Sequence, residues 1–121
     1  MPAVALTIFC YLIALAYAFG GAMHVANLSG FGPPPPRGKE WVFRALDVAY
    51  LVVNVLVVIG MIIGVAWGYA AFFAAAGSQL VLYLGFTDYF ASDADQRRQL
   101  RSLVHFHLIT ATVMATLLLL S

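Results

Sequence analysis

This sequence contains unusually few charged residues. Lys, Arg, Asp and Glu make up 9% of its 121 residues, whereas hydrophobic residues make up 64%. Soluble domains contain about 25% charged residues, so this composition excludes a soluble globular monomer. All the charged residues and histidines lie within residues 24–47 and 88–107. Such alternation indicates a polytopic membrane protein, because a charge at the bilayer centre costs about 2.5–3.5 kcal/mol.

Other absences exclude several kinds of site. Cys10 is the only cysteine, so neither an intramolecular disulfide nor a thiolate metal cluster can form, and we expect it to pack as a small hydrophobic residue. The sequence has no HxxxH or CxxC spacing, so we predict no metal site. It has no basic face for nucleic acid, no GxSxG motif and no phosphate-binding glycine loop, so a non-enzymatic role is favoured.

What the sequence does contain is apolar runs long enough to cross a bilayer, which takes about 20 residues. The longest run, residues 45–86, is twice that length and breaks at Gly64-Val-Ala-Trp67-Gly68. We predict one all-α membrane domain over 1–121, a four-transmembrane-helix bundle with helices at about 4–28, 42–64, 67–90 and 93–120. Ser92-Asp-Ala-Asp95 resembles a capping box that begins the last helix. The first span lacks a preceding Lys or Arg, so we expect a retained helix and not a signal peptide.

All basic residues fall in the first and third loops of this layout, with none in the second. They are Arg37, Lys39, Arg44, Arg97, Arg98 and Arg101. The positive-inside rule therefore predicts that loops 29–44 and 88–102 are cytoplasmic and that both termini lie outside, as in a multi-pass protein of a prokaryotic inner membrane. The three arginines that begin the last helix are expected to contact lipid phosphates.

Polar residues gather near the inner ends of the predicted helices. His24, Asp47, Asp88 and His105 would lie at similar depth, where a His–Asp pair satisfies both partners. The predicted polar cluster contains Asn27, Asp47, Tyr50, Asn54 and Asp88. A structural hydrogen-bonded cluster is the favoured interpretation, and a role in binding a ligand or cofactor or in handling protons is the alternative. Helix packing is expected at the small residues Gly20, Gly60 and Gly64.

The histidines also suggest a cofactor hypothesis. Two axial haem ligands can come from different helices, so His24 could join His105 or His107. His105 and His107 diverge by about 200° on a helix and cannot both face one partner. Haem or quinone held at the inner face by these histidines is therefore an open hypothesis.

Two glycine-containing segments resemble those of the DoxX-like group of small four-helix membrane proteins. The matching residues are Gly20-Gly21 in the first helix and Gly60…Gly64-Val-Ala-Trp67-Gly68 at the second turn. The resemblance implies a compact bundle, in some members partnered with quinone-linked redox enzymes, and it implies no catalytic residue. The charged signature of many members is absent, since the first helix carries His24 and no Lys or Arg.

Three functions follow as hypotheses. The leading one is a non-catalytic accessory subunit that packs against the helices of other membrane subunits or of further copies of itself. The second is a haem- or quinone-binding redox protein. The third is translocation of protons or small solutes, which ranks last because the outer halves of the first and last helices offer so few polar side chains.

Overall fold

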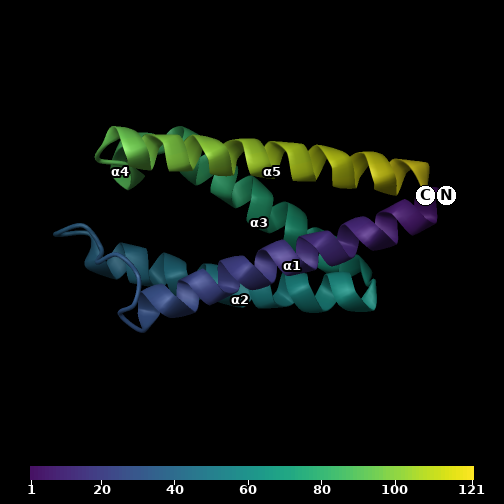
Figure 1. Cartoon of the computed structure of the whole chain (residues 1–121), viewed down its shortest axis with the longest axis horizontal. Coiled ribbons are helices and arrows are strands. Elements are labelled where there is room, and N and C mark those ends of the chain that lie inside the picture. The colour runs from purple at the N-terminus through teal and green to yellow at the C-terminus, as the bar shows by residue number, and fades with distance from the viewer. The chain divides into compact units, whose positions relative to one another are not determined.

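The structure is a computed structural model that describes all residues, 1–121, and it contains helices and no strands. The helices are α1 (Pro2–Leu28), α2 (Glu40–Ile63), α3 (Ala66–Gly85), α4 (Thr87–Phe90) and α5 (Ala94–Leu120) (Figure 1). Four of them are long and apolar enough to cross a membrane, and α4 is a single turn. The predicted fold class, an all-α membrane protein with four spanning helices, is confirmed.

The helix boundaries differ from the predicted ones mainly in the third span. Prediction extended it to residue 90, but α3 ends at Gly85 and α4 follows as a separate turn. Phe86 separates the two helices with φ −130° and ψ 37°, outside the helical region. A glycine followed by this residue therefore ends the span one turn earlier than hydrophobicity alone indicates.

The capping box at the beginning of α5 starts one residue later than predicted. The N-cap is Asp93, whose side chain accepts a hydrogen bond from the Gln96 N–H at 2.8 Å. The Gln96 side chain reaches back and accepts from the backbone N–H of Ser92 at 2.6 Å. The pair is thus Asp93 with Gln96, because glutamine can return this second bond better than a short aspartate.

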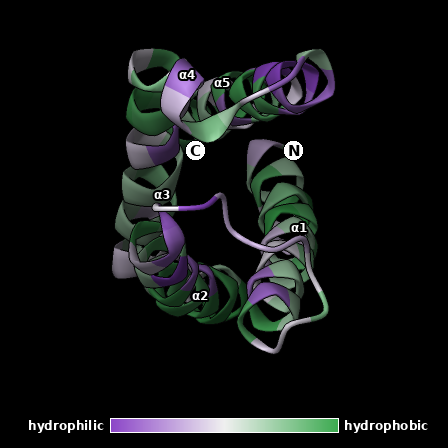
Figure 2. Cartoon of the chain, turned by 90° about the vertical axis from the view of Figure 1, so that its left-hand side faces the viewer, coloured by the Kyte–Doolittle hydropathy of each residue, from purple (hydrophilic) through white to green (hydrophobic).

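The surface of the long helices is apolar. Large side chains such as Leu15, Ile63, Val81 and Ile109 are each about 60% exposed or more. Figure 2 shows hydrophobic colour along the four long helices and hydrophilic colour concentrated toward several helix ends and the loops. In water this surface would favour aggregation, whereas in a bilayer it faces acyl chains at no such cost.

The chain divides into two compact units. The α1–α2 unit comprises Cys10–Ala71, and the α3–α5 unit comprises Met1–Phe9 together with Phe72–Ser121. In the α1–α2 unit, α1 and α2 run antiparallel and are joined by the loop of residues 29–39 (Figure 1). Cys10 is buried there, with its sulfur 3.9 Å from the Tyr69 hydroxyl.

Close contact between helices in the α1–α2 unit depends on glycine. A β-carbon on Gly68 would lie 2.6 Å from the carbonyl carbon of Gly60 and 2.7 Å from its Cα. Helices α2 and α3 therefore cross with their backbones in contact at Gly60 and Gly68. Gly64, predicted to be a packing residue, has a different role. It caps α2 at φ 69° and has nothing within 4 Å of its β-carbon position, so the backbone conformation explains this glycine.

Candidate functional site

A polar cluster joins the end of α1 to the beginning of α2. His24 Nδ1 lies 2.7 Å from Asp47 Oδ1, and Asn27 Nδ2 donates to the same oxygen at 3.1 Å. The two side chains of this hydrogen-bonded pair are partly buried, with exposed fractions of 22% for His24 and 15% for Asp47. One carboxylate thus connects two side chains that lie three residues apart, on one face of α1.

The carboxylate also determines which nitrogen of His24 carries a proton. An ionised carboxylate can only accept, so Nδ1 must be the donor. In the neutral ring, Nε2 then carries a lone pair and can accept a hydrogen bond or coordinate a metal. Tyr50 stacks on the His24 ring, with centroids 6.1 Å apart and planes inclined by 18°, and this limits its rotation.

Asn54 extends the polar contacts one turn deeper into the membrane. In the orientation that satisfies its amide, Nδ2 donates to the Tyr50 carbonyl at 3.3 Å and Oδ1 accepts from the Gly21 N–H at 3.1 Å. A β-carbon at Gly20 would lie 2.9 Å from that amide. The sequence placed Gly20 in a packing role, and the structure shows that its neighbour is this buried polar side chain.

Gly32 was not recognised from the sequence, although it covers the cluster. It lies so close to Asn27 that a β-carbon on Gly32 would overlap the Asn27 Oδ1 atom. That oxygen is buried and accepts no conventional hydrogen bond. The loop thus returns over Asn27 at a glycine, where no side chain obstructs the approach, and the Asn27 amide has its nitrogen toward Asp47.

The remaining charged residues that we predicted as sites lie in the α3–α5 unit. Asp88 accepts a hydrogen bond from Arg97 at 2.6 Å, across the junction between α4 and α5. Arg98 lies 3.5 Å from Asp95, one turn away on the same helix. Arg101 is exposed and contacts no carboxylate, so of the three arginines it is the one most available to a lipid phosphate.

The other two histidines occupy opposite environments on α5. His105 is exposed, whereas His107 is 4% exposed and neither of its ring nitrogens has a hydrogen-bond partner. Their divergence follows from the helical geometry. Both belong to the α3–α5 unit and His24 belongs to the α1–α2 unit. No group of three or more His, Cys, Asp or Glu side chains gathers in a way that could hold a metal ion.

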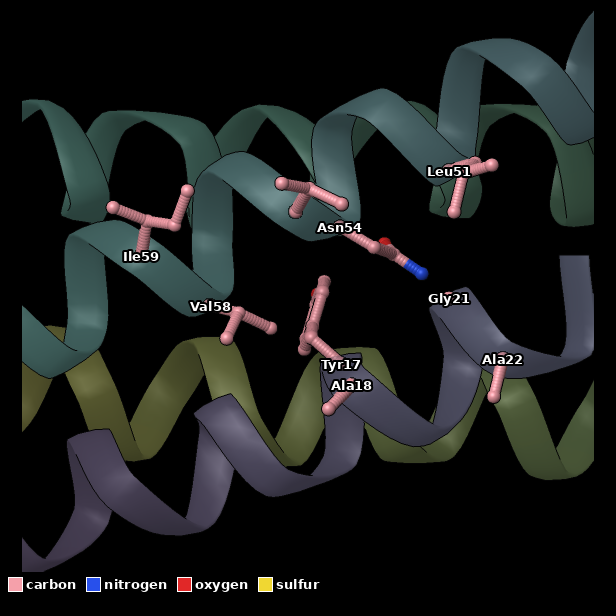
Figure 3. A pocket seen from close by; sticks show the side chains of 9 residues that line it. Tyr17, Ala18, Gly21, Ala22, Leu51, Asn54, Val58 and Ile59 are labelled. Carbon is pink, nitrogen blue, oxygen red and sulfur yellow. The ribbon is translucent and has the colours of Figure 1, made fainter. Parts of the chain in front are cut away.

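A groove runs between α1 and α2 next to the polar cluster. Its volume is about 280 Å³, and its walls are apolar side chains from both helices with Tyr17 and Asn54 between them (Figure 3). Its rim residues Ala18, Ala22 and Val55 are exposed. The groove therefore opens toward the surroundings of the helices, which in a membrane are acyl chains.

Helix α3 presents a row of small residues at the surface. Ala66, Ala70, Ala74 and Ser78 follow one another at four-residue steps, and all four are exposed. The Ser78 hydroxyl donates to the Ala75 carbonyl of its own helix at 3.0 Å. Small residues at this spacing allow another helix backbone to approach closely, so we name these four residues the α3 small-residue row.

Comparison of the chain with protein-family models, with curated proteins and with solved structures finds no match.

Proposed function

We propose that this chain is a non-catalytic accessory subunit of a larger membrane complex, docked through the α3 small-residue row. In a bilayer, helices gain nothing by hiding apolar surface from lipid, so association depends on close packing. The row offers that packing along three helical turns, and it is exposed. This observation carries the proposal, and the partner it fits is a transmembrane helix that has small residues on the contacting face.

The proposal includes a location and an orientation. The membrane is a prokaryotic inner membrane, with loops 29–44 and 88–102 in the cytoplasm and both termini outside. The support is the distribution of basic residues, six in the two loops on one side and none in the turn on the other.

The test is purification at native expression level in mild detergent or native nanodiscs, followed by mass spectrometry of the intact assembly. A stoichiometric partner is expected, and Ala74→Leu should remove at least nine-tenths of it because leucine prevents close backbone approach. Ala49→Leu, at an exposed position of α2, is the matched control and should retain the partner. A wild-type monomer without a partner would refute the proposal, and a homo-oligomer sensitive to Ala74→Leu would assign the row to self-assembly instead.

A second candidate function is binding of a quinone-type redox cofactor at His24. The observation in its favour is the orientation of that ring, whose Nδ1 is held by Asp47 while Nε2 remains available. A carboxylate behind a histidine fixes the tautomer and the ring orientation, which suits hydrogen bonding of Nε2 to a quinol hydroxyl. Organic extracts of the purified protein should contain quinone in near-stoichiometric amount, and those of His24→Ala should not. Extracts without quinone from the wild type would remove this candidate.

A further inference from the structure

We infer that the α1–α2 groove is the binding site for the chain of a prenyl quinol whose head group hydrogen-bonds to His24. This inference rests on the second candidate function and extends it, because it names the reduced form as the ligand and assigns a place to its apolar chain.

The groove and the polar cluster are adjacent along both helices. On α1, Gly21 lines the groove and His24 follows three residues later, which is about 4.5 Å along the axis. On α2, Leu51 and Asn54 line the groove, and Tyr50, adjacent to Leu51, stacks on His24. A ligand with its head at His24 therefore has the groove directly beneath it, toward the membrane centre.

The polar cluster selects the chemistry of the head group. When His24 is neutral, its Nδ1 donates to Asp47, so Nε2 accepts, and the carboxylate itself also accepts. The hydroxyl of a quinol can donate a hydrogen bond to these two acceptors, whereas the carbonyl of a quinone cannot. A carboxylate head, as in a fatty acid, would be repelled by Asp47.

The groove selects the chemistry of the chain. The Asn54 amide in its lining makes hydrogen bonds to Tyr50 and Gly21, so the amide does not require a polar group on the ligand. At about 30 Å³ for a water-sized group, 280 Å³ accommodates roughly nine such groups, enough for the first part of one chain. A diacyl lipid would leave its second chain outside, so a single prenyl chain fits better.

The experiment compares two quinols of the same head group, one with a short chain and one with a decaprenyl-like chain, bound to the full-length protein in nanodiscs. Ala18→Leu and Ala22→Leu each add a side chain to the exposed rim of the groove without touching the polar cluster. Each should weaken the long-chain quinol at least fivefold and the short-chain quinol less than twofold. Ala5→Leu, exposed on α1 outside the groove, is the matched control and should change neither. The oxidised quinones should bind at least fivefold more weakly than the quinols.

The outcomes separate the inference from the function on which it rests. If neither quinol binds the wild type, the second candidate function fails and the groove assignment fails with it. If both bind but the two leucine variants affect them equally, the head-group site stands and the chain assignment is overturned. A diazirine on the chain gives an independent measurement, since it should label residues 51–59 of α2 or 17–22 of α1. Labelling confined to other residues would also overturn the assignment.

Discussion

The crossing of α2 over α3 gives the sharpest stability prediction. Replacing Gly68 by alanine places a β-carbon 2.6–2.8 Å from three backbone atoms of Gly60, its carbonyl carbon, Cα and oxygen. Backbone atoms cannot rotate aside as a side chain can, so the helices must separate. Overpacking of this kind costs about 1–3 kcal/mol, and the better helix propensity of alanine returns at most about 1 kcal/mol of it. We therefore expect Gly68→Ala to lower the free energy of unfolding by up to about 2 kcal/mol.

The matched control is Gly77→Ala in the same helix. Its β-carbon would meet nothing within 4 Å, so only the propensity gain of about 1 kcal/mol applies. Unfolding of both variants in mixed micelles of rising SDS content can be followed by the fluorescence of Trp67, whose ring lies beside Gly60. The propensity gain is common to both variants, so they should differ by the overpacking cost of about 1–3 kcal/mol, with Gly68→Ala less stable. Equal stability of the two would refute the backbone contact at this crossing.

Three further predictions concern the polar cluster and the topology. A double-mutant cycle with His24→Ala and Asp47→Ala in the same SDS titration should give a coupling free energy of about 0.6–1.7 kcal/mol, and an additive result would mean that the pair contributes nothing. Gly32→Ala should displace the Asn27 amide and destabilise the protein by about 1–3 kcal/mol in wild type. It should cost less in an Asn27→Ala background, where only the contact with the Cα of residue 27, at 3.1 Å, remains, and an equal cost in both backgrounds would contradict the amide contact. In a Cys10→Ala background, Ser121→Cys should react with an impermeant maleimide on intact cells, whereas Phe31→Cys should react only after permeabilisation. The reverse pattern would invert the proposed orientation.

Local patterns were enough to predict the helices. The scarcity of charge and the length of the apolar runs can be read directly from the sequence. The four spans and their ends near Leu28 and Leu120 could therefore be predicted without knowing how the chain packs. The end of α3 was mispredicted because the apolar run continues through Phe86, and Tyr89 and Phe90 follow shortly after it. Only the backbone conformation at Phe86 reveals the break.

The site was less predictable because its contacts join segments distant in sequence. His24 and Asp47 could be expected at similar depth, since both lie near helix ends, but the sequence could not say which acid each histidine meets. Gly60 was predicted to pack within a GxxxG pair, and its actual contact is Gly68 on the next helix. Gly32 gave no signal, because a glycine in a proline-rich loop is ordinary until the loop is seen to return over Asn27.

The two functional proposals make separate demands on the molecule, and this determines how they can be tested against each other. The docking proposal concerns α3, where Ala74 is exposed and far in sequence from any charged side chain, whereas the quinol proposal concerns α1 and α2 around His24 and the groove. If the chain is only an accessory subunit, Ala74→Leu releases the partner while Ala22→Leu and His24→Ala change nothing but stability. If it delivers quinol to a partner, His24→Ala should abolish quinol binding and leave the partner bound, whereas Ala74→Leu should do the opposite. If either variant alone abolished both quinol binding and partner binding, the two sites would be energetically coupled. Sites on separate helices would otherwise be expected to respond independently.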